Sequence, residues 1–575
     1  MALRDLVVLL VDCQTTGANP KSGSVIEIGW ARSDALHDGE KTAGINAHLF
    51  KQPSDFEIPR RVQKLTGIEP DDLLEGSNPE DVWAQILSTA EAVAGLNERQ
   101  TCPTVIHFAK FEIPFLTDLH VRFGANKDFP FTFICTHEMS RRLFPDLPRR
   151  SIRAIAGYLG HSLQELRRCR EHVQATALIW REIVSIIEKK RGIHSLEQLL
   201  QWIHGSKSSI SSSRVYPMSA RKLHSIPHKP GVYRMLRSNG DVLYVGKASS
   251  IRQRVRSYFR KKVRHPEHIL EMLSQARQLD LTVTESALEA AILETDEIKR
   301  FSPPYNVALR KGERNVWFCS NDFDEFSPAP TAEHRIGPIV DRETMVGFAA
   351  VRKVVEIGGV SEAAGELLLR GLGVPETYAP ELQVVKAGYE IFLTKHRDIL
   401  HAGAASQSLG ELARQLWLQR KTEKLEEKDE TEDFALKSIE IRAWTANSVC
   451  RSIESNIMRA GHAMRRARWL VLLTESSLGW MELPFPDGNC FVVVFENGQI
   501  LYRRVQSNGQ IPIPPGHRRS FLQRQRSIDI MTYDRMRVVT TEIRRVVSEN
   551  RWIELRLSPV NTLGYEKLLS VFRWL

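Results

Sequence analysis

Two tyrosines, a lysine and a glycine stand at hairpin spacing in the stretch GVYRMLRSNGDVLYVGK. The pair Asn239-Gly240 favours a tight turn, and a strand-like run flanks it on each side. A two-residue loop at this pair places Tyr233 opposite Gly246 and brings Tyr244 to the same face of the hairpin. Two phenols would then border a position without a side chain, with Lys247 beside it, and leave room for a phosphate. An ordinary hairpin with aromatic packing is the alternative.

A basic segment follows the hairpin, and its sequence SSIRQRVRSYFRKKVRH contains no acidic residue. Lysine and arginine side chains neutralise a phosphate backbone, and Tyr258 and Phe259 can stack on bases or sugars. A charge run is usually a solvated face, but a run of a single sign favours nucleic-acid contact. The expected DNA-binding residues are Arg252, Arg256, Arg260, Lys261 and Lys262.

The segment TESALEAAILETDEIKRF predicts a helix with one informative carboxylate. Glu294 shares a small apolar stripe with Ala290, Ala291 and Ile298, where an unpaired charge is costly to bury. A bound divalent cation makes such a carboxylate tolerable, and a Lys or Arg partner is the commoner alternative. The helix carries further acids that we interpret as solubilising charges on its polar side, namely Glu285, Glu289 and Asp296.

These three segments resemble the GIY-YIG nuclease family, of the UvrC and Cho type, over residues 226–312. Gly231-Val232-Tyr233 matches the first family triplet, and Tyr244-Val245-Gly246 matches the second. Glu294 fits the metal-ligand helix, and Pro304-Tyr305-Asn306 fits the closing asparagine. One departure is ETDEIK, where UvrC-like proteins usually show E-x-N-L-I-K.

The resemblance implies a metal-dependent DNA endonuclease and a role for each matching residue. Glu294 would hold one Mg²⁺ or Mn²⁺, which polarises the scissile phosphate. Arg254 would stabilise the charge that builds on phosphorus, and Tyr233 would act as general base towards water. Because a free phenol has a pKa of about 10, the pKa of Tyr233 must fall, with Lys247 and the metal lowering it. The remaining expected site residues are Tyr244 and Tyr258, which position water and phosphate, and Asn306, which holds the closing loop.

The first 185 residues alternate apolar strands with helical patterns, which predicts an α/β domain. Three of its motifs, VDCQTTG, HFAKFEIPFL and LRRCREHVQATA, resemble those of DnaQ-like exonucleases of the DEDDh type. The resemblance implies an RNase H-like fold. Such enzymes hold two metal ions with four acids and use a histidine to activate water.

Only two of those four carboxylates remain in this chain, namely Asp12 and Glu112. Gln14 replaces the second acid, and counting back from Ala-Thr-Ala puts Arg167 at the catalytic histidine and His172 at the last aspartate. Histidine is a poor ligand for Mg²⁺, and Arg167 stays protonated and adds positive charge. We therefore predict a folded but degenerate domain that binds nucleic acid or a partner without hydrolysing it.

The chain has 575 residues and a net charge of +10, which predicts several domains and permits a nucleic-acid partner. It has no apolar window of about 18 residues, so no membrane partner is expected. Its seven cysteines are scattered, which indicates reduced thiols in a cytoplasm. The expected partners are DNA and, from the resemblance, a UvrB-like damage-loading protein.

The expected organisation is a multidomain α/β and α+β protein. Residues 186–225 include a Ser-rich linker, and residues 313–433 form a connecting and helical region. Residues 434–575 form a mixed C-terminal region of unidentified role, with a hairpin turn at Asn497-Gly498. The leading function is excision-repair-like DNA incision. The alternatives are a 3′–5′ exonuclease and a non-catalytic DNA-repair adaptor.

Overall fold

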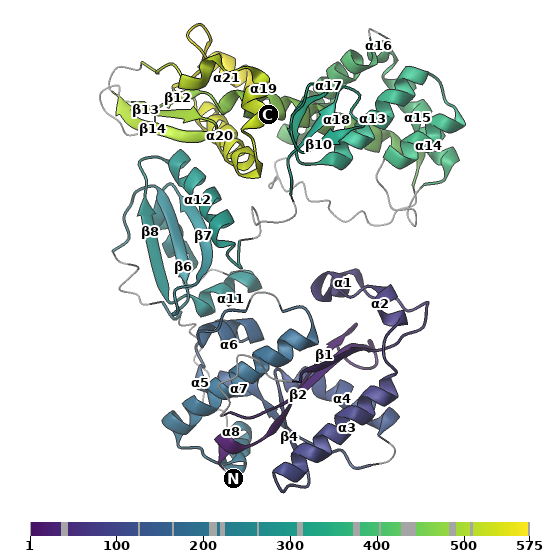
Figure 1. The fold of residues 1–575 in the computed structure, drawn as a ribbon, viewed down its shortest axis with the longest axis vertical. Coiled ribbons are helices and arrows are strands. Elements are labelled where there is room, and N and C mark those ends of the chain that lie inside the picture. The colour runs from purple at the N-terminus through teal and green to yellow at the C-terminus, as the bar shows by residue number, and fades with distance from the viewer. Residues whose placement is uncertain are drawn as a thin grey trace. The chain divides into compact units, whose positions relative to one another are not determined.

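The computed structural model divides into two compact units, residues 1–290 with 300–310 and residues 291–299 with 311–575 (Figure 1). The structure describes residues 2–35, 44–124, 127–163, 166–205, 216–218, 223, 225–260, 264–306, 314–371, 380–401, 404–426, 444–481, 490–506 and 510–572.

A five-stranded mixed sheet of order β3-β2-β1-β4-β5 forms the centre of the N-terminal domain. Strands β1 to β3 pair antiparallel, whereas β4 lies parallel to both β1 and β5. This mixed α/β sheet agrees with the predicted fold class. The strands are β1 (Val8–Thr15), β2 (Val25–Ser33), β3 (Asn46–Leu49), β4 (Cys102–Ile106) and β5 (Phe131–Cys135).

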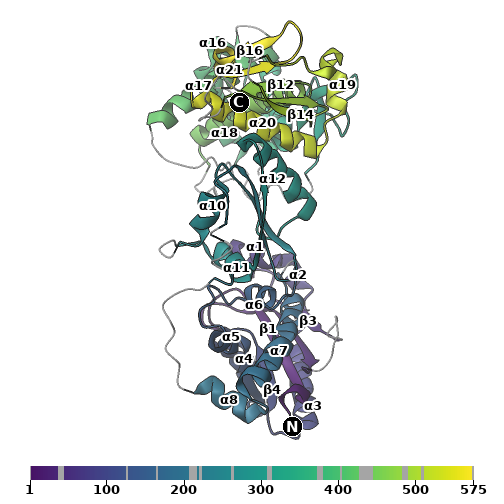
Figure 2. The ribbon, with the colours of Figure 1, turned by 90° about the vertical axis from the view of Figure 1, so that its left-hand side faces the viewer.

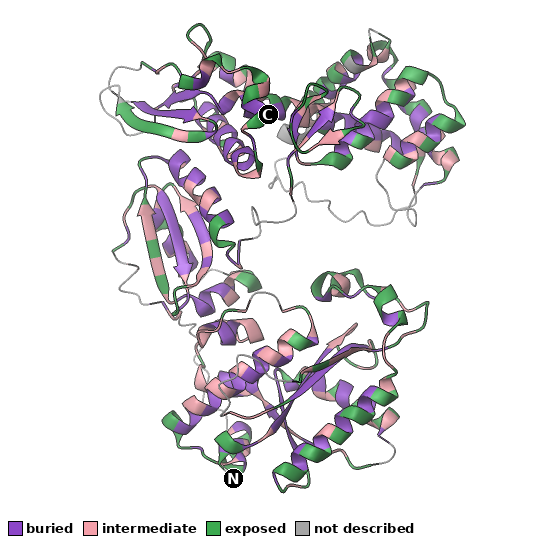
Figure 3. Ribbon diagram, in the orientation of Figure 1, coloured by how far each residue is buried: buried purple, intermediate pink, exposed green. Residues whose placement is uncertain are grey.

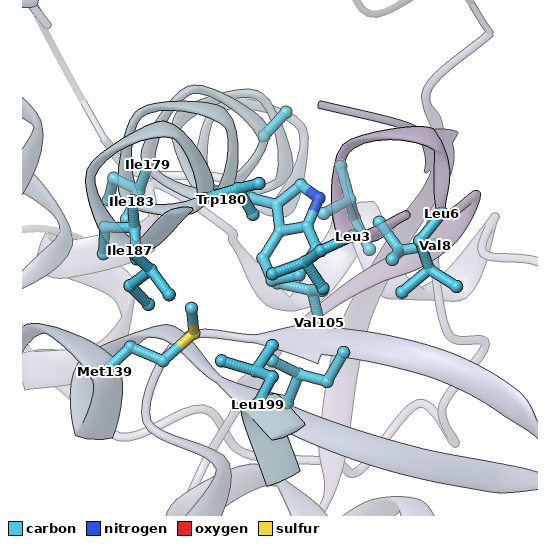
Figure 4. Packing of buried hydrophobic residues seen from close by; sticks show 14 of the residues in the cluster. Leu3, Leu6, Val8, Val105, Met139, Ile179, Trp180, Ile183, Ile187 and Leu199 are labelled. Carbon is cyan, nitrogen blue, oxygen red and sulfur yellow. The ribbon is translucent and has the colours of Figure 1, made fainter. Parts of the chain in front are cut away.

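Helices cover this sheet, and α7 packs against β1 and β2. Trp180 of α7 is fully buried and belongs to one hydrophobic cluster with Leu3 and Val105 (Figure 4). The same cluster includes Leu199 and Ile203 of α8, so the core extends past the expected boundary at residue 185. The helices are α1 (Arg60–Thr66), α2 (Pro70–Leu74), α3 (Pro79–Leu96), α4 (Ala109–Phe123), α5 (Thr136–Leu143), α6 (Ile152–Tyr158), α7 (Cys169–Arg191) and α8 (Leu196–His204), with a short 3₁₀ helix, η1 (Leu3–Asp5).

The central domain contains a three-stranded antiparallel sheet of order β7-β6-β8, formed by β6 (Gly231–Leu236), β7 (Val242–Ala248) and β8 (Gln278–Val283). The middle strand β6 is buried for almost its whole length, whereas β8 mixes exposed and half-buried residues (Figure 3). The helices of this domain are α10 (Ile251–Tyr258), α11 (Glu267–Gln275) and α12 (Ala287–Phe301).

The loop of the β6–β7 hairpin corrects one prediction. Arg237 pairs with Asp241 through its backbone N–H, so the loop contains three residues rather than the expected two. A register shift between Met235 and Leu236 compensates for the extra residue, and Tyr233 still lies opposite Gly246. The predicted register is therefore confirmed although the predicted loop length is wrong.

The second unit contains a helical core packed against a small three-stranded sheet. Helices are present within residues 313–433, as predicted. Helix α18 packs against α13, α15 and α17, so it belongs to this core although the expected boundary lay at residue 433. The elements are β9 (Trp317–Ser320), β10 (Phe326–Ser327), β11 (His334–Ile339), α13 (Arg342–Ile357), α14 (Glu362–Gly371), α15 (Leu382–Lys395), α16 (Arg397–Leu400), α17 (Ala405–Glu426) and α18 (Ala446–Leu473).

A second five-stranded sheet, of order β14-β13-β12-β15-β16, ends the chain. Asn497 and Gly498 have φ values of 50° and 70° at the β13–β14 turn, which confirms the predicted hairpin. The elements are β12 (Ser477–Trp480), β13 (Cys490–Glu496), β14 (Gln499–Gln506), η3 (Pro515–Arg518), α19 (Phe521–Arg526), α20 (Ile530–Ser548), β15 (Ile553–Arg556), β16 (Thr562–Gly564) and α21 (Tyr565–Phe572).

The helices of the described segments include none with the length and apolar character that a membrane crossing requires. All seven cysteines are free thiols, and six of them are buried.

Candidate nuclease site

A cluster of three phenols forms around Gly246 of the central domain. The ring centroids of Tyr233 and Tyr244 lie 6.0 Å apart, and the hydroxyls of Tyr233 and Tyr258 lie 3.1 Å apart. A Cβ atom on Gly246 would stand 2.5 Å from the Tyr233 hydroxyl and 2.7 Å from the Tyr244 ring. Only glycine therefore fits between the two phenols, as the predicted register requires.

Burial controls the protonation of this cluster. Tyr233 is fully buried, and burial, with added contributions from Tyr244 and Tyr258, raises its pKa well above 10. Arg254 opposes this rise, and its guanidinium lies 5.2 Å from the centre of the Tyr258 ring. The protein groups alone therefore leave the pKa of Tyr233 raised, and the lowering expected from Lys247 together with the metal stays a prediction.

Asn306, in the segment after α12, holds strand β7 beside the tyrosine cluster. Its side-chain oxygen accepts from the backbone N–H of Val245 at 2.9 Å, and its amide donates to the Val245 carbonyl at 2.8 Å. Asn306 is 6% exposed, so both bonds are shielded from water. The strand between Tyr244 and Gly246 is thereby fixed by one side chain, which fits the predicted role of Asn306.

Helix α12 carries Glu294, which is half-buried, among the buried residues Ala290, Ala291 and Ile298. This is the apolar stripe that the sequence predicts. A half-buried carboxylate on such a stripe fits a hard divalent cation. The role of Glu294 as metal ligand stays a prediction.

Two of the three acids interpreted as solubilising charges on this helix have other surroundings. Glu289 is only 4% exposed, and its carboxylate accepts from the backbone N–H of Glu285. Asp296 accepts two hydrogen bonds from Arg535, at 2.9 and 3.0 Å. Glu285 is exposed, as expected. The interpretation of Glu289 and Asp296 as solubilising charges was therefore wrong. Helical periodicity does not show the partners of these two acids.

The basic residues after the hairpin divide into two groups. Arg252 and Arg256 are half-buried and donate through Nε to the carbonyls of Ile226 and Leu223, at 2.5 and 3.3 Å. They therefore anchor the segment before β6 as well as adding positive charge. Arg260 is exposed. Lys261 and Lys262 lie outside the described residues.

A cavity of about 650 Å³ opens at the ends of β1 and β4 in the N-terminal domain. Asp12 and Glu112 line it together with Gln14, and His172 reaches it from the first turn of α7. The motif positions predicted for these four residues therefore converge. Leu166 rather than Arg167 lines the cavity, and Arg167 is exposed, so the charge expected from Arg167 inside the site is absent.

An internal ion pair neutralises part of this cavity. His172 Nδ1 lies 3.1 Å from Asp12, and although burial opposes it, Asp12 raises the pKa of His172 to about 9. Burial, followed by the nearby Asp12, raises the pKa of Glu112 well above its usual value. Asp12 Oδ2 and Glu112 Oε2 are buried without a hydrogen-bond partner. The Asp12 carboxylate is therefore already paired with the His172 ring, and Glu112 carries its charge less readily than an ordinary carboxyl group.

Two divalent ions do not fit this donor set, because four carboxylates are needed to balance their charge. Across the described ranges, no group of three or more His, Cys, Asp or Glu residues is placed to hold a metal ion.

The sequence did not single out His107, His137 or the arginines on the cavity wall. Burial lowers the pKa of His107 to about 3, and its ring is held by Thr136 and the Arg150 carbonyl.

Comparison with known proteins assigns the two domains. A family described as a UvrC-like GIY-YIG domain matches residues 229–307, which contain both tyrosine strands and α12. The central domain is thus similar to UvrC-like GIY-YIG domains. A family described as an exonuclease matches residues 9–170. The N-terminal domain therefore has an exonuclease fold, as predicted.

Curated relatives match a short part of the chain. UvrABC system protein C of Psychrobacter cryohalolentis is 45% identical over 115 residues, which is 19% of each protein. UvrABC system protein C of Sphingopyxis alaskensis is 49% identical over 88 residues, which is 15% of this chain and 14% of the relative. The chain thus spans less than a fifth of the length of these relatives.

Two solved structures are similar to separate parts of the chain. The magnesium-bound GIY-YIG N-terminal endonuclease domain of Thermotoga maritima UvrC is 34% identical, with a TM-score of 0.14, and the match covers 15% of this chain and 93% of that domain. Exonuclease X in complex with 5′ overhanging duplex DNA is 19% identical, with a TM-score of 0.24, over 34% of this chain and 99% of its own.

A polar seam joins the GIY-YIG domain to the exonuclease-fold domain, where α11 lies beside α6 (Figures 1 and 2). Glu271 of α11 accepts from Ser151 at 2.5 Å and from Tyr305 at 2.8 Å. Gly157 of α6 packs so closely that a Cβ there would stand 1.8 Å from the Gln275 side-chain oxygen. No sequence motif pointed to this seam, because its residues lie in segments without a catalytic pattern.

Proposed function

We propose that the chain is a metal-dependent DNA endonuclease that makes nucleotide-excision-repair-like incisions through its GIY-YIG site. The observation that carries this proposal is the cluster of Tyr233, Tyr244 and Tyr258 around Gly246, with Arg254 beside it. A site of this kind presents hydroxyls and one guanidinium to a phosphodiester.

The residues of the site have separable tasks in this proposal. Glu294 would hold the cation, and a bound Mg²⁺ or Mn²⁺ supplies Lewis-acid polarisation of the phosphate. Arg254 stabilises negative charge on phosphorus. Burial keeps the proton on Tyr233. Positive charge beside the phenol would release this proton to solvent, and the phenolate oxygen would then accept a proton from the attacking water.

The exonuclease-fold domain is proposed to bind DNA or a partner without hydrolysis. Its cavity retains Asp12 and Glu112, but the ion pair between Asp12 and His172 occupies the carboxylate that a cation would need. A 3′–5′ exonuclease is therefore the weaker candidate. An adaptor without catalysis is weaker too, because the tyrosine cluster and Asn306 are assembled.

We also propose a cytoplasmic location and a loading partner for the protein. Seven free thiols fit a reducing cytoplasm. The relatives are named as components of a UvrABC system, and this supports a UvrB-like protein as the loading partner.

One assay tests these assignments together. Nicked, damaged and end-labelled duplexes are incubated with Mg²⁺ or Mn²⁺ and with wild type, Glu294→Ala or Asp12→Ala. We expect internal cuts by wild type and Asp12→Ala, and none by Glu294→Ala. Stepwise loss from DNA ends that disappears in Asp12→Ala would instead identify an exonuclease. Intact DNA with every variant would identify an adaptor.

A further inference from the structure

The helix that carries Glu294 is contacted by the C-terminal region, which lies outside the residues matched by either family. Residues 291–299 of α12 belong to the same compact unit as residues 311–575. Within this unit α20 supplies two charged residues, Asp534 and Arg535, to α12.

Arg535 makes a bidentate contact with Asp296. Its guanidinium donates to both carboxylate oxygens, at 2.9 and 3.0 Å, and also to the Gly498 carbonyl at 3.1 Å. The Arg535 side chain is 5% exposed, so it is held by the β13–β14 turn on one side and by α12 on the other. Two parallel hydrogen bonds fix direction as well as distance.

Asp534 makes the second contact, one helical turn further along α12. Its carboxylate lies 2.8 Å from Lys299 Nζ, and the two side chains are 1% and 6% exposed. Lys299 also donates to the Ile530 carbonyl at 2.9 Å. A buried charge of this kind is strongly disfavoured once its partner is removed, so the pair holds the helices in one register.

The two contacts lie on the side of α12 away from its predicted metal ligand. At 3.6 residues per turn, Asp296 and Lys299 point about 160° and 140° around the helix from Glu294. The C-terminal region therefore contacts the side of α12 that is opposite Glu294. It also gives a physical reason for the aspartate in ETDEIK, where the resemblance leads one to expect asparagine.

We propose that α20 positions the metal-binding carboxylate and that Arg535 and Asp534 are positioning residues for Glu294. This inference rests on the proposed function, in which Glu294 holds the cation. It assigns a role to residues 434–575, for which sequence patterns indicated none.

The test measures Mn²⁺ binding to the full-length protein, without DNA, from the electron paramagnetic resonance signal of free Mn²⁺. Glu294→Ala defines the signal without the site. We expect Arg535→Met to weaken binding about 10- to 100-fold, the range found when groups that orient a metal ligand are removed. Arg545→Met is the matched control, because Arg545 of the same helix pairs with Glu542 and Glu549 of α20 and its end.

Asp296→Ala is the second variant, and it removes the same contact from the side of α12. Arg535 keeps its hydrogen bond to the Gly498 carbonyl in this variant, so the fold of the C-terminal region is spared. We expect Asp296→Ala to weaken Mn²⁺ binding as well. Unfolding curves confirm that each variant is folded at the assay temperature. Folded Arg535→Met and Asp296→Ala proteins with wild-type affinity would overturn the inference and leave the proposed function intact. A wild type that neither cleaves DNA nor binds Mn²⁺ at Glu294 would overturn both.

Discussion

At the scale of single residues, Gly246 and Asn306 determine the shape of the GIY-YIG site more directly than the groups expected to do chemistry. Gly246 allows two phenols to approach, and Asn306 holds the backbone between them. Sequence reasoning predicted the neighbours of Gly246 correctly, because Tyr233 still lies opposite Gly246 after the register shift in β6. It could not predict the raised pKa of Tyr233, because burial depends on the whole domain core.

Gly246→Ala is therefore expected to displace the phenols of Tyr233 and Tyr244 from their positions in the site. The added methyl group would clash with Tyr233 and Tyr244, which costs about 1–3 kcal/mol of stability and about 100-fold in cleavage rate. Gly240→Ala is the matched control in the same hairpin. Gly240 has a φ of 92° and open space around it, so alanine there strains the loop but leaves the phenols in place. Equal cleavage rates for the two variants, measured on folded protein, would contradict this account.

The pair between His172 and Asp12 predicts a pH-dependent stability. Asp12 raises the pKa of His172 from 6.5 to about 9 in the folded state. The resulting stabilisation, on the order of 3 kcal/mol, is fully present below pH 6.5 and is lost as pH rises through about 9. Urea unfolding should therefore show a difference between wild type and His172→Gln that shrinks between pH 6 and pH 10. A difference that stays constant over this range would rule out the charged pair.

At the scale of elements, periodicity predicted the strands and helices but not their partners. The β6–β7 register was right because a register shift offsets a loop longer than predicted. The acids of α12 were misread, since a helical pattern shows which face is polar but not whether another element covers it. Asp296 faces Arg535, which is 239 positions away in the chain.

Asn306 gives a prediction at this scale, because it links the segment after α12 to β7. Asn306→Asp keeps the acceptor for the Val245 N–H but loses the donor to the Val245 carbonyl. We expect a loss of about 1–3 kcal/mol, the cost of leaving buried polar groups unsatisfied. Thermal unfolding measures this loss, and an unchanged melting temperature would show that the two bonds contribute nothing.

At the scale of the whole molecule, the N-terminal domain has an exonuclease fold, and we propose that its cavity lacks the charge that two metal ions need. Its three motifs were readable from the sequence, and so were the substitutions at Gln14 and His172. The seam through Glu271 was not readable, because its residues belong to two domains and follow no shared pattern.

Glu271→Ala tests whether that seam stabilises the first unit. It removes the acceptor of Ser151 and Tyr305, and should lower the free energy of unfolding by about 1–3 kcal/mol. Glu267→Ala, on the same helix, removes only a surface pair with Arg149 in which the glutamate side chain is 78% exposed, and should cost less than about 1 kcal/mol. Equal effects of the two substitutions in urea unfolding would show that the seam adds no stability.

The central claim is that one carboxylate of the GIY-YIG domain binds the catalytic cation and that the exonuclease-fold cavity binds none. Anomalous scattering from crystals soaked in Mn²⁺ tests it most directly. The account predicts a manganese peak at Glu294 and no peak between Asp12 and Glu112. A peak at the Asp12 cavity, or a bare Glu294 at saturating Mn²⁺, would contradict it.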